Sequence, residues 1–63
     1  MITKAFFITP TFEAGVAVGK LSLFLSKTRL GRVSISEDNT LVTITAVDSQ
    51  VMAYAENLLA AYV

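Results

Sequence analysis

The chain of 63 residues contains neither cysteine nor histidine, which excludes disulfide bonds, thiolate zinc sites and imidazole ligands. Its hydrophobic content of 54% and charged content of 16% are apolar values for so short a chain, because small domains have the most surface to cover with polar groups. Five basic and five acidic residues give a formal net charge of zero, so no overall field attracts nucleic acid or an acidic membrane. We therefore expect one compact domain over residues 1–63 that leaves some apolar side chains outside its core.

The first predicted element is a strand from Ile2 to Thr9, a segment rich in β-branched and aromatic residues that Pro10 ends. Side chains alternate across a strand, so Phe6 and Phe7 must point to opposite faces. Because a two-layer protein covers only one face of its sheet, we expect one of these two rings to stay uncovered within a single chain.

The next predicted element is a helix that begins between Thr9 and Glu13 and runs to about Lys27. A threonine suited to cap the helix lies on either side of Pro10, and Glu13 complements the positive end of the helix dipole. At helical spacing, the apolar residues that we assign to the sheet-facing side are Ala14, Ala17, Val18, Leu21, Phe24 and Leu25.

This helix carries more apolar surface than one sheet can cover. A second apolar stripe, next to a polar strip of Glu13, Lys20 and Lys27, consists of Phe12, Val16 and Leu23. Glycine costs a helix interior about 1 kcal/mol relative to alanine, so the pair Gly15 and Gly19 suggests that another backbone approaches here. That backbone would belong either to the same chain or to a second copy, and both alternatives stay open.

A hairpin is predicted after the helix. Residues 28–31 end the helix with basic side chains near its last turn and with Gly31 for the reversal of the chain. One strand begins near Arg32, a loop with acidic and turn-forming residues covers 37–40, and the return strand covers Leu41 to Val47. Apolar and hydroxyl side chains alternate along the return strand, so one of its faces is apolar.

A second helix is predicted to follow Asp48, which is suited to cap it. Its inward residues, at helical spacing, are Val51, Met52, Ala55, Leu58, Leu59 and Tyr62. The residues expected to face away are Ala53, Asn57 and Ala60. We interpret Tyr62 as part of the core and Tyr54 as a surface anchor for a partner.

The order strand-helix-strand-strand-helix predicts a two-layer α+β fold, with a three-stranded sheet and both helices on one face. This is the ferredoxin-like arrangement without its last strand. The right-handed crossover rule leads us to expect the first strand to be parallel to a neighbour. Because the last strand is missing, the first strand should lie at an edge of the sheet, where an apolar segment invites pairing with another chain.

No catalytic residue, cofactor site or metal site is predicted. General acid–base and nucleophilic catalysis rely most often on histidine or cysteine, and the chain has neither. Glu13 and Glu56 lie on different predicted helices, and the other three acidic residues lie at loop or cap positions. We therefore interpret the acidic residues as solvated or capping groups, and we expect a protein that is not an enzyme.

The excess of apolar surface predicts a small accessory or regulatory protein that acts through protein–protein interaction, as a homodimer in the cytoplasm. The dimer would join two first-strand edges, or pack two open sheet faces with Phe7 and Leu41 between them. Its longest apolar stretch, Gly15 to Leu25, is interrupted by Lys20 and is too short to span a membrane. The residues predicted to form the partner or self-interface are Phe6, Phe7, Phe12, Val16, Leu23, Leu41 and Tyr54.

The alternative hypothesis is a nucleic-acid-binding module. Lys27, Arg29 and Arg32 are spaced around the predicted helix end and turn, where their donors could converge on a phosphate. The competing interpretation is that basic residues simply favour the negative end of a helix dipole.

Overall fold

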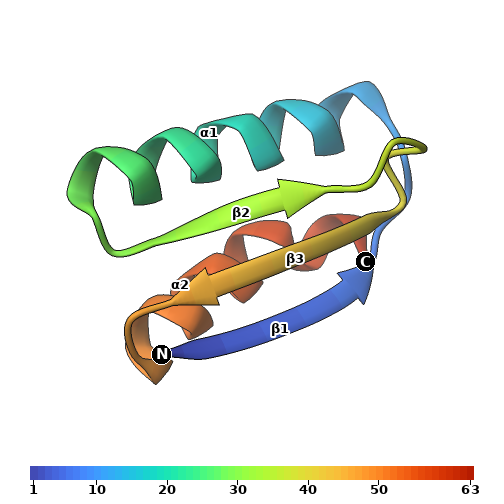
Figure 1. The fold of residues 1–63 in the computed structure, drawn as a ribbon. Helices are drawn as coiled ribbons and strands as arrows, with labels where there is room; N and C mark the ends of the chain where they lie inside the picture. Colours follow the sequence, from blue (N-terminus) through green and yellow to red (C-terminus); the bar gives the residue numbers. More distant parts are fainter.

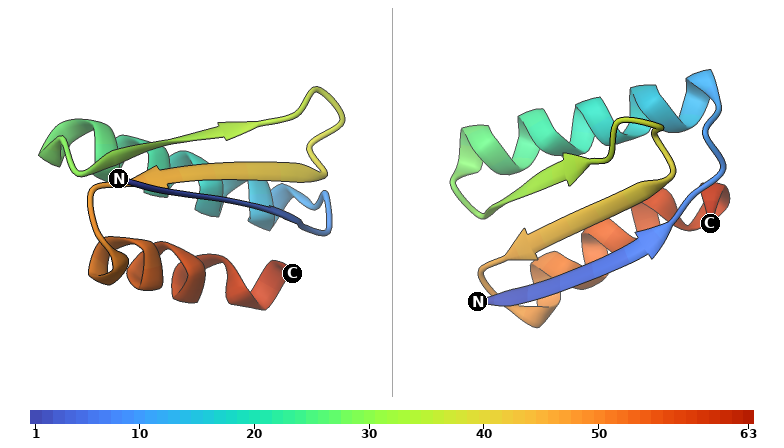
Figure 2. Two further views of the ribbon diagram at one scale, coloured as in Figure 1. Left: turned by 60° about the horizontal axis from the view of Figure 1, so that its bottom comes forward. Right: turned by 45° about the vertical axis from the view of Figure 1, so that its right-hand side comes forward.

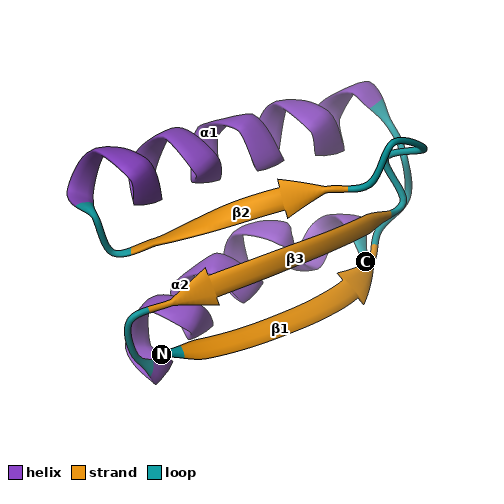
Figure 3. Cartoon of the chain, in the orientation of Figure 1, coloured by secondary structure: helices purple, strands orange, loops and turns teal.

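A computed structural model describes all 63 residues and contains one three-stranded sheet with both helices on one of its faces (Figures 1 and 2). The elements are β1 (Ile2–Phe7), α1 (Phe12–Thr28), β2 (Gly31–Ile35), β3 (Leu41–Ala46), α2 (Ser49–Leu59) and a terminal 3₁₀ turn, η1 (Ala60–Tyr62). Figure 3 shows that short loops connect them. The predicted two-layer α+β arrangement is confirmed.

The strand order is β1-β3-β2, so β3 is central and β1 lies at an edge, as predicted. β1 pairs antiparallel with β3 from Ile2 opposite Ala46 to Phe7 opposite Leu41, and β2 also pairs antiparallel with β3. The expectation that β1 has a parallel neighbour is wrong. β1 and β2 do run in the same direction, because a helix connects them, but the return strand of the hairpin is inserted between them.

The core lies between the sheet and the helices. β3 contributes its alternate residues Val42, Ile44 and Ala46, all of them fully buried. The other buried residues are Ile8, then Ala14, Val18, Leu21 and Leu25 of α1, and Met52, Ala55 and Leu59 of α2. Most of the residues that the helical spacing assigned to the inward faces are therefore in the core.

Side chains cap both helices at the predicted positions. The hydroxyl oxygen of Thr11 accepts a hydrogen bond from the Ala14 N–H at 3.1 Å, and a carboxylate oxygen of Asp48 accepts one from the Val51 N–H at 2.9 Å. These bonds satisfy backbone donors that the first turn of a helix leaves free. Of the two candidate threonines for α1, the structure thus selects Thr11.

The reversal after α1 differs from its prediction. Arg29, with φ of 58°, takes the left-handed conformation, and its N–H donates to the Leu25 carbonyl. No glycine has a positive φ. Gly31 instead begins β2, where a β-carbon would overlap the carbonyl oxygen of Thr45 on the neighbouring strand. The glycine is therefore needed for close strand pairing and not for the turn.

The glycine pair in α1 has no close neighbour within the chain. A β-carbon on Gly15 or Gly19 would have no atom within 4 Å outside the local helix. Of the two alternatives for these residues, the approach of a backbone from the same chain is therefore excluded.

The hairpin loop is held by a compact set of hydrogen bonds. One carboxylate oxygen of Asp38 accepts bonds from the Ser36 hydroxyl at 2.6 Å, the Thr40 hydroxyl at 2.7 Å and the Thr40 N–H at 3.2 Å. Asn39 has φ of 60°, a conformation that asparagine tolerates better than most residues. The bonds from Ser36 and Thr40 favour the charged carboxylate and lower the pKa of Asp38.

Because this pKa is lower in the folded chain than in the unfolded one, Asp38 stabilises the fold above its unfolded pKa, which is about 3.9. That stabilisation is lost as the pH falls through the folded pKa. We expect Asp38→Asn to be less stable than wild type at pH 7, with the two stabilities converging as the pH falls through the folded pKa of Asp38. Urea unfolding of both proteins between pH 2 and pH 7 measures this difference. A stability difference that is constant over this range would contradict it.

Candidate functional site

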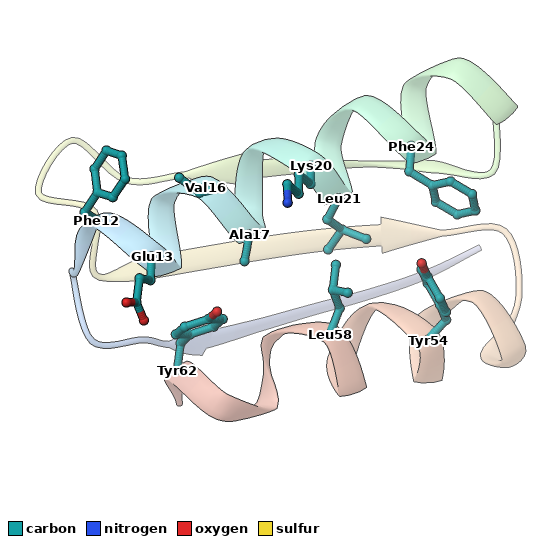
Figure 4. Close-up of a pocket in the computed structure, with 10 residues that line it drawn as sticks. All are labelled: Phe12, Glu13, Val16, Ala17, Lys20, Leu21, Phe24, Tyr54, Leu58 and Tyr62. Carbon is teal, nitrogen blue, oxygen red and sulfur yellow. The ribbon is translucent and has the colours of Figure 1, made fainter.

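A groove of about 520 Å³ runs between α1 and α2 (Figure 4). Eight of its ten lining residues are hydrophobic. The lining consists of Phe12, Glu13, Val16, Ala17, Lys20, Leu21, Phe24, Tyr54, Leu58 and Tyr62. A concave, mostly apolar surface with a few polar groups is the usual form of a binding site.

Helical spacing places these side chains along the groove. Ala17 and Phe24 are four residues after Glu13 and Lys20, so the four share one side of α1. Tyr54 and Leu58 are likewise four residues apart on α2. The two helices run in opposite directions, so Phe12 lies at the same end of the groove as Tyr62, and Phe24 at the same end as Tyr54 (Figure 4). The Phe24 and Tyr54 rings contact each other, with centroids 5.3 Å apart and an interplanar angle of 44°.

Several groove residues are more exposed than their patterns predicted. Phe24 and Leu58 were assigned to the inward sides of their helices, but 40% and 38% of their surfaces are exposed. The three strands present a narrow sheet, and the buried residues of both helices already cover its inner face. Side chains on the flanks of the inward sides therefore meet across the gap between the helices. The sequence signal for this mixed surface was the predicted apolar stripe with Phe12 and Val16, next to the polar strip with Glu13 and Lys20.

The groove also carries charge. Lys20 projects from the middle of α1, and Glu13 lies two turns nearer to its N-terminus (Figure 4). The one ion pair of the structure joins Lys4 and Glu56 instead, with 2.7 Å between Nζ and Oε1. Lys20 and Glu13 thus have no partner of opposite charge within the chain, and both are available to a bound molecule.

The predicted interface residues lie on more than one surface. Phe12, Val16 and Tyr54 line the groove, and Phe12 is 86% exposed. Leu23 belonged to the same predicted stripe but is exposed outside the groove. Phe6 is partly buried against the core, below the edge of the sheet.

The open face of the sheet carries the remaining two predicted interface residues. Phe7 is exposed there, directly opposite Leu41 on β3. Toward the other end of the same two strands, the hydroxyl groups of Thr3 and Thr45 lie 3.3 Å apart. This face mixes apolar and hydroxyl side chains, and it is separate from the groove because the sheet lies between them (Figure 2).

The three basic residues of the alternative hypothesis are all exposed, but they do not share one face. Lys27 lies in the last turn of α1, and Arg29 follows the helix. Arg32 pairs with Thr45, and alternation along β2 places it on the open face of the sheet, away from the helices. The backbone therefore does not direct Arg32 and Lys27 toward one point.

The acidic side chains are dispersed, and no three of them come together in a group that could hold a metal ion. Neither helix combines the length and the apolar character needed to cross a membrane. Comparison with protein-family models, with curated proteins and with solved structures finds no match for this chain. The surfaces described above are therefore the basis for a proposed function.

Proposed function

We propose that this chain is a non-enzymatic accessory protein of the cytoplasm, which acts as a homodimer and binds a helical segment of another protein in the groove between α1 and α2. The observation that carries the proposal is the groove itself, about 520 Å³ in volume and lined mainly by apolar side chains. Two of these, Phe12 and Tyr54, are exposed aromatic rings. Exposed aromatic side chains beside a concave surface are the residue types that most often dominate binding energy at protein interfaces.

A short amphipathic helix fits the shape of this groove. From Phe12 to Phe24, α1 rises by about 18 Å, which is the length of roughly 12 helical residues. A helix bound in a groove presents apolar residues at spacings of three, four and seven. Lys20, which is unpaired, favours an acidic side chain on the bound helix, and Glu13 favours a basic one. The order of these two charges along the bound helix would therefore set the direction in which that helix lies in the groove.

The proposal is tested by selection from a displayed library of 16-residue amphipathic helices against the wild-type chain. We expect the enriched peptides to carry an acidic residue between apolar anchors. Loss of an aromatic anchor at an interface typically costs at least about 2 kcal/mol, so Tyr54→Ala should weaken their binding about 30-fold in fluorescence anisotropy. Lys20→Glu should reverse the preference from acidic to basic peptides.

Leu23→Ala is the matched control, because Leu23 is an exposed apolar residue of α1 outside the groove. Peptide affinity should be unchanged in this variant, and circular dichroism should show that all three variants remain folded. A library that yields no binder, or binders that are indifferent to Tyr54→Ala and Lys20→Glu, would refute the groove as the binding site.

A further inference from the structure

The outer edge of β1 presents a short, defined set of free backbone groups. The Ile8 N–H donates to the Thr40 carbonyl at 2.7 Å, which continues the β1–β3 register by one pair. In an antiparallel ladder the backbone groups of successive residues point to opposite sides. The even-numbered residues of β1 therefore bond to β3, and Thr3, Ala5 and Phe7 direct their N–H and C=O groups outward.

Hydrogen bonds on the other side of the sheet agree with this assignment. The Ser36 N–H donates to the Leu41 carbonyl at 2.9 Å, in the register of β2 with β3. The odd-numbered residues of β3 therefore direct their backbone N–H and C=O groups toward β2, and the even-numbered residues of β3 direct theirs toward β1.

The free edge ends at Phe7. The next outward N–H along the chain is that of Thr9, and it donates to the Tyr62 carbonyl at 2.7 Å. The turn η1 thus closes this end of the edge. An added strand can pair only with Thr3, Ala5 and Phe7.

The surface next to this edge is concave on the side of the sheet that carries the helices. Two depressions, of about 590 Å³ and 150 Å³, lie between β1 and α2, and both are lined by the ion pair of Lys4 and Glu56. The Glu56 Oε1 atom is buried and has no polar partner besides the Lys4 ammonium. Apart from the buried Met52, the other residues that α2 and η1 present here are small or polar, namely Ser49, Ala53, Asn57 and Ala60.

We infer that β1 of a second copy pairs antiparallel with this edge, with the two-fold axis at Ala5, so that two chains form one six-stranded sheet. The inference rests on the proposed homodimer and specifies its interface. With the axis at Ala5, Ala5 lies opposite Ala5 of the second copy and Thr3 lies opposite Phe7. All outward N–H and C=O groups of the three residues then bond across the junction.

The neighbouring registers are less favourable. An axis at Lys4 would place the two lysines directly opposite each other, which is destabilising. An axis at Phe6 would pair Thr3 with Thr9, whose N–H is already bonded to Tyr62. The axis at Ala5 avoids both problems.

The second copy would also fill the hollows. A two-fold axis through the sheet keeps all four helices on one face and brings the two α2 helices side by side. A stable interface buries about 800 Å² per partner, which is about a fifth of the 4212 Å² surface of this chain and more than one strand edge supplies. The small side chains of Ala53 on α2 and Ala60 in η1 allow the two chains to approach closely here, and with the polar Asn57 they contribute the remaining area. The groove between α1 and α2 stays open in this dimer.

Opposite charges at residue 5 test the register. We expect wild type to show twice its 6.8 kDa mass in size exclusion with light scattering. Ala5→Lys and Ala5→Glu should each raise the dimer dissociation constant at least tenfold, or about 1.4 kcal/mol, because like charges meet at the axis. An equimolar mixture of the two variants should form a heterodimer, which native mass spectrometry resolves. Ala5→Pro, which removes an outward N–H without affecting the ladder to β3, should also be monomeric.

Ser34→Lys and Ser34→Glu are the controls, because Ser34 is an exposed residue of the opposite edge strand. These variants should remain dimers. A wild-type monomer at millimolar concentration, dimers that tolerate both charges at residue 5, or variants that fail to recombine would each overturn the inference. The peptides selected for the groove should bind Ala5→Lys as they bind wild type, so failure of this dimer and failure of the groove are separate results.

Discussion

Leu25→Ala is expected to lower the free energy of unfolding by about 2–5 kcal/mol, whereas Leu23→Ala is expected to change it by less than about 0.5 kcal/mol. The two leucines lie two residues apart on α1, but Leu25 is fully buried and Leu23 is 64% exposed. Truncation of Leu25 removes apolar contacts and leaves a cavity in a close-packed core. Truncation of Leu23 removes a side chain that already contacts water, and alanine is at least as favourable in a helix.

Urea unfolding at one fixed protein concentration measures this contrast, because the proposed dimerisation would make stability depend on concentration. A chain of this length has a total stability of roughly 3–9 kcal/mol, so Leu25→Ala removes a large part of it. Similar losses for both variants would mean that the α1 face carrying Leu23 is covered, and would contradict the orientation of α1 in this structure.

The three glycines are expected to respond to alanine in opposite directions. Gly31→Ala should destabilise the fold by about 1–3 kcal/mol or more, because its β-carbon would overlap the Thr45 carbonyl oxygen, a backbone atom that cannot move without disturbing the strand pairing. Gly15→Ala and Gly19→Ala should each stabilise the folded chain by about 0.5–1 kcal/mol, because their surroundings are open and alanine favours the helix.

Thermal unfolding of the three variants, again at matched concentration, distinguishes these outcomes. For a domain of this size, 1 kcal/mol shifts the midpoint by roughly 4–8 °C. Stabilisation at Gly15 and Gly19 together with unchanged dimerisation is expected. Loss of the dimer in these two variants would instead show that a second copy contacts α1 at its glycines, and would contradict an interface at β1.

The groove contains part of the apolar surface that the core does not bury. Phe12, Phe24 and Leu58 are exposed in the groove because they lie on the flanks of their helices. Small Ala5 lies on the edge strand, where a large side chain would hinder a second strand at the proposed axis. In our proposals, two surfaces on different sides of α2 serve for self-association and for the binding of a separate helical ligand.

Local physics within the sequence determined most of the fold. The alternation along β3 and the helical spacing of Leu21 and Leu25 identified the buried faces, because burial follows the period of each element. Asp48 was recognisable as a cap, and Thr9 and Thr11 as alternative caps of α1, since a short polar side chain before a helix satisfies its free N–H groups. The order of the elements led to the expectation that β1 would lie at an edge, which the strand order confirms.

Tertiary structure alone decided how these elements meet. The groove exists because two helices share a narrow sheet, which leaves Phe24 and Leu58 between the helices. Helical spacing within one segment carries no information about the width of the sheet on which the helix packs. The position of Gly31 also depends on another strand, because the nearby Thr45 carbonyl leaves no room for a β-carbon there. The left-handed residue of the turn is Arg29 and not Gly31. The end of the free edge also depends on a distant residue. The Thr9 N–H, which follows β1, is bonded to the Tyr62 carbonyl, and only folding brings residues so far apart in the chain within hydrogen-bond distance.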